Sequence, residues 1–173
     1  MNRLSIPSNF EAINNQYLQL KMTDINSVLI IGNIASGKST FAADFSKLNN
    51  FEIIELDAIR DCEIKDIQGY RSAENEFLKL IGKPKYVCVY VGMGLGERGQ
   101  IANLKSDLII RIHASEKTCF QRIEKRINNP PYAPKIDIQL LRYISETLDK
   151  RGYSVECSDF NGTPLIHFSS GGL

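Results

Sequence analysis

The nine residues GNIASGKST, from Gly32 to Thr40, constrain this chain more than any other stretch. They satisfy the pattern GxxxxGK[ST], they follow a short apolar run at 27–31, and they lead into a sequence that reads as helical from Lys38. The mechanics of this pattern require that placement, because its glycines let backbone N–H groups surround an anion at a helix N-terminus. The stretch therefore predicts a phosphate-binding loop between a buried strand and a helix.

Individual positions in this loop have expected roles. We expect the backbone to cradle the phosphates of a nucleotide, Lys38 to reach the β- and γ-phosphates, and the Ser39 hydroxyl to ligate Mg²⁺. The expected nucleotide-binding residues are Gly32, Asn33, Ile34, Ala35, Ser36, Gly37, Lys38, Ser39 and Thr40.

A second glycine-rich stretch, GLGERG at 94–99, spells the GxGxxG pattern of a dinucleotide site. In such a site the pattern opens a helix, and an acid about 20 residues later holds the ribose. Here only QIANLK separates the pattern from Ser106, and the acid at the right distance, Glu116, lies beyond the next apolar run. This stretch fits a dinucleotide site poorly, so we expect phosphate to bind at 32–40.

Apolar runs alternate with helical patterns along most of the chain. Strands are expected at 27–31, 51–56, 85–91, 107–114 and near 164–169. Helices are expected at 38–48, 58–82, 116–127 and 137–151, and a short one is expected after 94–99. The helix at 58–82 should be interrupted near Gly69, Ser115 should be the N-cap of the helix at 116–127, and Gly152 should end the last one. Apolar strands that alternate with helices predict an α/β fold in which a parallel sheet is covered on both faces. The ligand site is then expected at the carboxyl ends of the strands.

Length and charge narrow the class of protein. At 173 residues the chain fits a single domain, in which residues 1–25 are expected to add one helix. Lys and Arg total 21 against 20 for Asp and Glu, and this balance argues against a nucleic-acid or anionic-membrane partner. No run approaches the roughly 18 apolar residues of a membrane span, and the N-terminus lacks a signal-peptide core, so we expect a cytoplasmic protein.

The cysteines and histidines are expected to be structural. The four cysteines, Cys62, Cys88, Cys119 and Cys157, never form a CxxC, which favours buried, reduced thiols over a zinc site or a redox pair. His113 and His167 both fall in strand-like apolar runs, so we interpret them as hydrogen-bonded core residues.

The order of these elements resembles the nucleoside and nucleotide kinases of the adenylate-kinase type. Within that group the chain is most similar to the small kinase-like topology modulation proteins, over about residues 27–168. The features that carry this likeness are ELDAI after the second strand, a glycine after the third, an arginine in the following loop, SDLIIRI, and a Cys-x-x-Arg-x-x-x-Arg helix. The resemblance implies a three-layer P-loop fold with a five-stranded parallel sheet in the order 2-3-1-4-5, an acceptor-binding insert after strand two, and a short lid at about 128–136. It also implies an ATP-dependent phosphotransferase.

The resemblance also implies roles for residues outside the loop. Asp57 would hold the acceptor or take its hydroxyl proton, although it could also, or instead, be a helix N-cap. Arg122 and Arg126 are four residues apart, hence expected on one helix face, and would join Lys38 as catalytic residues that clamp the phosphoryl group. The alternative for the pair is a solvated basic face near a helix C-terminus. Arg98 would contact the acceptor, with a plain surface arginine as its alternative.

One acid of hydrolytic P-loop proteins is missing. The third strand, VCVYVGMG, ends without an Asp for the Mg²⁺ shell; Glu97 lies in the following loop, and Asp107 is expected at the wrong end of the next strand. Because many small kinases hold Mg²⁺ through the loop Ser and water, the absence weighs more against a motor or switch than against a kinase. No NKxD pattern for guanine is present either.

These observations favour a kinase that uses ATP and Mg²⁺ to phosphorylate a small acceptor, namely a nucleoside, a nucleotide or a related hydroxyl compound. Two alternatives stay open: a nucleotide-binding regulatory module with weak or no turnover, and a 5′-hydroxyl polynucleotide kinase, which the neutral charge balance disfavours. The identity of the acceptor, the choice between ATP and another nucleoside triphosphate, and the choice between monomer and homodimer are left open.

Overall fold

A computed structural model describes residues 7–20, 25–63, 67–90, 105–126 and 136–171. Its elements are α1 (Phe10–Leu20), β1 (Ser27–Gly32), α2 (Lys38–Asn49), β2 (Glu52–Glu55), α3 (Leu56–Glu63), α4 (Ile67–Leu80), β3 (Tyr86–Tyr90), β4 (Leu108–His113), α6 (Glu116–Glu124), α7 (Ile138–Leu148), a π-helical turn at Asp149–Tyr153, β5 (Asp159–Phe160) and β6 (Thr163–Ser169). Two regions of interest fall outside the described residues: the second glycine loop, which contains Arg98 and after which a short helix was predicted, and residues 128–135 of the lid.

The strands form one sheet in the order β2-β3-β1-β4-β6-β5. All pairs are parallel except β5 with β6, so the predicted five-stranded parallel core is confirmed, with β6 as its fifth strand. The two-residue strand β5 was not predicted. It forms because Asn161 and Gly162, both with positive φ (50° and 84°), turn the chain back on itself ahead of β6. An Asn-Gly pair is a hairpin signal, and it was present in the sequence.

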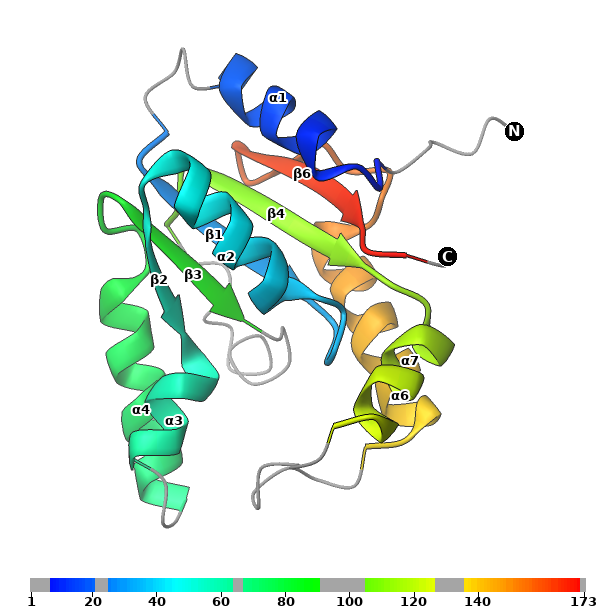
Figure 1. Ribbon diagram of the computed structural model, residues 1–173. Coiled ribbons are helices and arrows are strands. Elements are labelled where there is room, and N and C mark those ends of the chain that lie inside the picture. Colours follow the sequence, from blue (N-terminus) through cyan, green and yellow to red (C-terminus); the bar gives the residue numbers. More distant parts are fainter. Residues whose placement is uncertain (1–6, 21–24, 64–66, 91–104, 127–135, 172–173) are drawn as a thin grey trace.

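Strand β1 lies at the centre of the sheet and is buried along its whole length. Val28 and Ile30 pack on the face covered by α1 and α2, whereas Leu29 and Ile31 pack on the face covered by α3, α4 and α7 (Figure 1). A strand with both faces buried must read as an unbroken apolar run. The predicted three-layer arrangement is therefore confirmed.

Helix α1 matches the expected N-terminal helix and extends the α2 layer. Tyr17 is fully buried, and its ring meets that of Phe45 edge-on at 4.8 Å between centroids. Phe10 meets Phe41 in the same way at 5.1 Å. The backbone N–H of Ser169 in β6 also donates to the carbonyl of Pro7 at 2.7 Å. The segment before β1 thus covers the sheet next to α2.

Two helices differ from their predicted bounds. The interruption expected near Gly69 is wrong, because Gly69 lies inside α4, while the helical stretch is divided between Glu63 and Ile67. Helix α6 ends at Glu124, three residues earlier than expected. Helix α7 ends at Leu148 and is continued by the π-helical turn Asp149–Tyr153, in which Gly152 takes φ 99°, so the helical turns end near the predicted Gly152. None of the helices among the described residues is long and apolar enough to cross a membrane.

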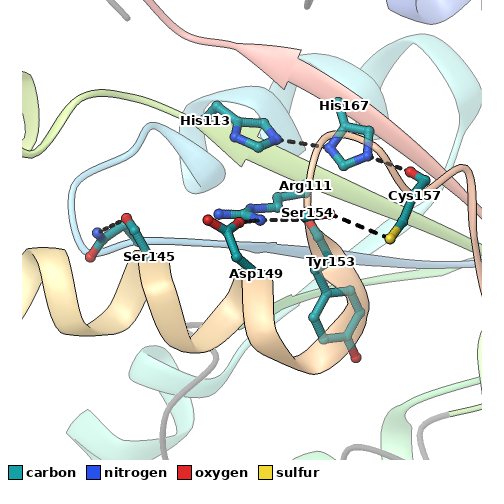
Figure 2. A network of polar contacts seen from close by, with 9 residues as sticks. Arg111, His113, Ser145, Asp149, Tyr153, Ser154, Cys157 and His167 are labelled. Atoms are coloured by element: carbon teal, nitrogen blue, oxygen red, sulfur yellow. Dashed lines mark hydrogen bonds and ion pairs between the residues drawn. The ribbon is translucent and has the colours of Figure 1, made fainter. Parts of the chain in front are cut away.

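Arg111 is a charged residue inside the sheet layer. Only 5% of it is exposed, and it lies in the middle of β4, on the face that packs against α7. Its Nη1 donates to the Asp149 carboxylate and, at 2.5 Å, to the carbonyl oxygen of Tyr153 (Figure 2). A buried guanidinium is costly unless paired. The turn after α7 supplies these partners, and this fastens the end of α7 to the sheet.

Two histidines continue this polar network along the same face. His113 Nε2 lies 2.8 Å from His167 Nδ1, and His167 Nε2 lies 2.8 Å from the Cys157 carbonyl (Figure 2). A carbonyl only accepts, so His167 carries its proton on Nε2 and its Nδ1 accepts from His113. Burial, followed by the charge of Arg111, lowers the pKa of His113 to about 3, and burial also lowers the pKa of His167. Both rings are hydrogen-bonded, as predicted, although each is only half-buried.

The described cysteines behave as structural residues. Cys88 and Cys119 are buried free thiols, as predicted, and burial raises the pKa of Cys88 to about 12. Cys157 is half-buried, and its Sγ lies 3.4 Å from Ser154 Oγ. The side chain of Cys62 lies outside the described part of the structure.

Paired substitutions at Tyr17 test how α1 is held. We expect Tyr17→Ala to lower the free energy of unfolding by about 3–5 kcal/mol, because it empties a fully buried aromatic site. Tyr17→Phe should be neutral or stabilise by up to about 1 kcal/mol, because the buried hydroxyl has no hydrogen-bond partner among the described residues. Urea denaturation measures both, with exposed Leu18→Ala as the control. A clear loss of stability in Tyr17→Phe would contradict the packing described.

The histidine pair predicts a pH dependence of stability. Between pH 6.5 and about 3, His113 binds a proton in the unfolded chain but not in the folded one. The free energy of unfolding should therefore fall with pH by about 1.4 kcal/mol per unit for this residue. Between pH 7.5 and 4.5 the free energy of unfolding should fall by about 2.7 kcal/mol less in His113→Asn than in the wild type, as urea denaturation at the two pH values would measure. Equal losses in both proteins would count against a neutral, buried His113.

Candidate nucleotide-binding site

The loop between β1 and α2 leaves the sheet at the carboxyl end of its central strand. A Cβ on Gly32 would lie 2.6 Å from the Ile112 carbonyl oxygen of β4, so no side chain fits there. Gly37 precedes α2 with φ 100°, a conformation that favours glycine. Ala35 has φ 56°, which bends the loop between these two glycines. The glycines of the motif are thus explained by close packing and by backbone conformation.

Asn33 fastens the loop to α7 through its side chain. Only 4% of the residue is exposed, and its Nδ2 donates to the Leu141 carbonyl at 2.6 Å and to Ser145 Oγ at 2.8 Å. Its Oδ1 accepts from the Ile34 N–H at 2.8 Å. The side chain is therefore fully occupied within the protein, and only the backbone of Asn33 remains for a ligand.

Lys38 is the first residue of α2 and is only 7% exposed. Its Nζ donates to the backbone carbonyl of Asn33 at 2.5 Å, and the N–H of Ser36 donates to the same oxygen at 3.2 Å. Burial lowers the pKa of Lys38 to about 8, while the negative charge of Asp57 opposes this shift. The loop therefore directs an ammonium and a backbone donor toward one point in its interior.

The site gathers charges from three other segments around Lys38. The charges of Asp57 and Glu55 raise the pKa of Lys38, and the charge of Arg126 lowers it. Glu55 ends β2, and Asp57 lies in the first turn of α3 directly after it. Asp57 and Arg126 are exposed side chains. The predicted groups Asp57 and Arg126 are thus each within electrostatic reach of Lys38, at the carboxyl edge of the sheet.

Glu55 is a charged neighbour of Lys38 that the sequence interpretation missed. It was counted inside the second strand, although its position as the last charged residue before Asp57 was a usable signal. The N-cap alternative for Asp57 is wrong, because α3 begins at Leu56 and Asp57 lies within its first turn. An acid there still benefits from the helix dipole.

The two arginines of the predicted clamp have different surroundings. Arg126 lies beyond the end of α6, where its N–H donates to the Ile123 carbonyl at 3.0 Å, so the expected single helix face is wrong. Arg122 is half-buried on α6, and its Nη1 donates to the Ala35 carbonyl at 3.1 Å. It also donates to Ser170, from Nη1 to Oγ at 3.0 Å and from Nη2 to the carbonyl at 2.6 Å.

The sequence offered two acids to consider for the Mg²⁺ shell, Glu97 and Asp107, and the structure describes one of them. The Asp107 carboxylate accepts from the N–H groups of Asn26 and Ser27 at 2.9 and 3.0 Å, which places it at the opposite end of β1 from the loop, as predicted. Glu97 lies outside the described residues. Among the described residues, no group of three or more His, Cys, Asp or Glu could hold a metal ion. Ser39 is exposed in the first turn of α2, where a hydroxyl can reach an ion that keeps its waters.

The loop fits a nucleotide polyphosphate on its own geometry. It combines a glycine in the left-handed region at a helix N-terminus, an inward-facing ammonium, and the buried Ser36 Oγ, which has no hydrogen-bond partner among the described residues. A helix N-terminus with unpaired donors and a buried cation is suited to an anion. These residues could hold the phosphates, with Ser39 as the protein ligand of Mg²⁺.

Comparisons with known proteins give a structural likeness only. No protein-family model matches the sequence, and no curated protein matches it either. The backbone is similar to a gluconokinase from Sinorhizobium meliloti 1021, at 16% identity, with 86% of this chain and 84% of that chain covered and a TM-score of 0.53.

Two further solved structures agree. A shikimate kinase from Acinetobacter baumannii, in complex with shikimate, is 17% identical over 76% of this chain and 80% of that chain, with a TM-score of 0.54. A deoxyadenosine kinase from M. mycoides with bound dATP is 18% identical over 83% and 90%, with a TM-score of 0.52. Identities of 16–18% establish the fold alone. The chain therefore has the P-loop fold of nucleoside and small-molecule kinases, as its sequence predicted.

Proposed function

We propose that this protein is a kinase that transfers the γ-phosphoryl group of ATP, with Mg²⁺, to a hydroxyl group of a small acceptor. One observation carries the proposal: the buried Lys38 ammonium points into the loop at the end of β1, within the field of the Asp57 carboxylate. A motor or a switch needs the cation, but it has no need of an exposed carboxylate opposite the transferred group. A kinase needs both, one for the donor and one for the acceptor.

Each residue then has one role in the transfer. The backbone of Gly32–Thr40 and the Lys38 ammonium hold the β- and γ-phosphates, and the Ser39 hydroxyl ligates Mg²⁺, which offsets phosphate charge when bound. Asp57 accepts a hydrogen bond from the acceptor hydroxyl and takes its proton as the new O–P bond forms and the bond to the β-phosphate breaks. ADP and the phosphorylated acceptor are the products.

The arginines complete this assignment. Arg126 neutralises charge on the phosphoryl group during transfer, since it is exposed and acts electrostatically on Lys38. Arg98 is proposed to contact the acceptor. For Arg122 the expected role was the same as for Arg126, but its donors are engaged by Ala35 and Ser170.

The structural neighbours support a small acceptor without identifying it. They are named as a gluconokinase, a shikimate kinase and a deoxyadenosine kinase, so each name refers to a small molecule. For this chain we propose a nucleoside, a nucleotide or a related hydroxyl compound.

Transfer of labelled γ-phosphate tests the proposal directly. The protein with Mg²⁺ and γ-labelled ATP is incubated with nucleosides, nucleotides, sugars, sugar acids and a 5′-hydroxyl oligonucleotide. Label in one small acceptor above background hydrolysis is the expected result. ATP binding with no labelled acceptor would favour a regulatory module, and label in the oligonucleotide alone would favour a polynucleotide kinase.

Lys38→Met should weaken ATP binding by about 10–100-fold, because it removes a charge-assisted contact with the phosphates. The pKa of about 8 adds a pH dependence, since only the protonated amine attracts phosphate. ATP affinity of the wild type should fall as the pH rises through about 8, and Lys38→Met should lack this titration. Isothermal calorimetry from pH 7 to 9.5 measures both effects.

The control for this experiment is Lys47→Met, an exposed lysine on the same helix. It should leave ATP affinity and its pH dependence unchanged. If Lys38→Met binds ATP as tightly as Lys47→Met does, phosphate binding at this loop is contradicted.

Asp57→Asn should lower kcat by about 10²–10⁴-fold with little change in ATP affinity at pH 7, because it removes the proton acceptor and leaves the phosphate loop intact. It should also move the pH midpoint of ATP binding to a lower value, since the Asp57 charge raises the pKa of Lys38. The matched control is Asp44→Asn, an exposed acid on α2. Unchanged kcat together with an unchanged midpoint would remove Asp57 from the site.

A further inference from the structure

Ser170, directly after β6, connects three segments at the base of the phosphate loop. Its N–H donates to the His113 carbonyl of β4 at 2.9 Å, and its Oγ donates to the Ser36 carbonyl in the loop. Its own carbonyl and Oγ accept from Arg122. It also packs against the loop, because a Cβ on Gly37 would lie only 3.3 Å from the Ser170 Cβ.

Arg122 completes this connection from α6. Its guanidinium bridges the Ala35 carbonyl of the loop and both acceptors of Ser170. Two consecutive loop carbonyls, those of Ala35 and Ser36, are therefore held by donors outside the loop, one by Arg122 and the other by Ser170.

The orientation of these carbonyls determines where the loop donors point. In a planar trans peptide the C=O and the N–H of one unit point in opposite directions. Fixing the Ala35 carbonyl outward turns the Ser36 N–H inward, where it meets the Asn33 oxygen that also receives Lys38. Fixing the Ser36 carbonyl turns the Gly37 N–H inward in the same way.

We propose that Arg122 and Ser170 form a latch that positions the backbone donors of the phosphate loop, so that both residues set nucleotide affinity without touching the transferred group. This inference rests on the proposed function and changes the role of one residue in it. Arg122 is a positioning residue, and the phosphoryl group is left to Lys38 and Arg126. The latch connects α6 and the end of β6 to the phosphate loop, which lies between β1 and α2.

The latch requires an arginine. A guanidinium presents several donors in a fixed plane, so it can reach Ala35 and both acceptors of Ser170 at once. A lysine carries the same charge at a single atom and cannot span these acceptors. Arg122→Lys therefore separates positioning from charge. If Arg122 only neutralised phosphate charge, lysine should largely preserve ATP affinity, whereas a latch that needs several donors should be lost.

The test is a double-mutant cycle on ATP affinity and on loop order. Calorimetric Kd values for ATP are measured for the wild type, Arg122→Lys, Ser170→Ala and the double variant. Each single change should raise the Kd for ATP by about 5–10-fold. The Kd of the double variant should lie within about 2-fold of the higher of the two single-variant values, because all three variants lose the same latch. The rate of transfer at saturating ATP should stay near that of the wild type.

Hydrogen exchange without nucleotide gives a second readout. Amides of residues 33–38 should exchange faster in both single variants, while those of β1 stay protected. The controls are Lys117→Ala, an exposed cation on α6, and Ser158→Ala, an exposed serine before β5. Ser170→Ala removes a single hydroxyl, so it keeps the test decisive if Arg122→Lys fails to fold.

Other outcomes overturn the latch. A lower transfer rate in Arg122→Lys with unchanged Kd, and no effect of Ser170→Ala, would make Arg122 a catalytic residue instead. Additive losses of affinity with unchanged exchange would also contradict it. If the wild type binds no ATP, the proposed function fails, whereas the exchange rates, measured without nucleotide, still decide the latch.

Discussion

The feature on which this site depends is a cation buried at the wrong end of a helix. Lys38 starts α2, where the helix dipole already places positive charge, and only 7% of the residue reaches solvent. Burial and the dipole both disfavour an ammonium there, and the pKa of about 8 reflects the burial. The protein keeps the charge through one loop carbonyl and the nearby acids Asp57 and Glu55. An incoming phosphate would relieve this cost, so the site favours an anion by its construction.

The loop that carries this cation is held from several sides. Asn33 joins it to α7, the carbonyls of Ala35 and Ser36 join it to α6 and to the end of β6, and Gly32 lies against β4. Helix α7 is in turn tied to β4 through Arg111 and Asp149. Three of the four contacts that hold the loop are hydrogen bonds of buried or half-buried polar groups. Removing one partner of such a bond costs stability, because the other group is left buried without a partner. The polar groups between the layers therefore connect the loop to the rest of the fold.

The sequence predicted what local pattern can reveal. The continuous apolar run at β1, the motif at 32–40 and the alternation of strands and helices led to the correct sheet core, because a parallel sheet with both faces buried leaves few alternatives. The position of Asp57 after β2 followed from the same reasoning.

The remainder depended on contacts between residues far apart in the chain. In the sequence, Arg111 is a polar break in an apolar strand, and its role becomes clear only when α7 brings Asp149 to it. Arg122 was expected to clamp the phosphoryl group or to lie on a solvated basic face, and its contacts with Ser170 could not be predicted from local pattern. The early end of α6 was missed because twelve residues from 116 continued a helical pattern, and no residue there is a helix breaker. The Asn161-Gly162 turn was different, since its signal was local and was overlooked.

These ties have a consequence for the energetics of binding. A flexible loop must lose conformational freedom when it closes on a phosphate, at roughly 1–2 kcal/mol for each ordered residue. Here the positive φ of Ala35 and the two hydrogen-bonded carbonyls already restrict the loop backbone, so under the proposed function folding rather than binding bears part of that loss. The same arrangement leaves Ser36 Oγ buried without a partner among the described residues and Lys38 partly desolvated. If the loop binds a nucleotide as proposed, contacts of the phosphates with these two groups would offset the stability that the folded protein loses by burying them.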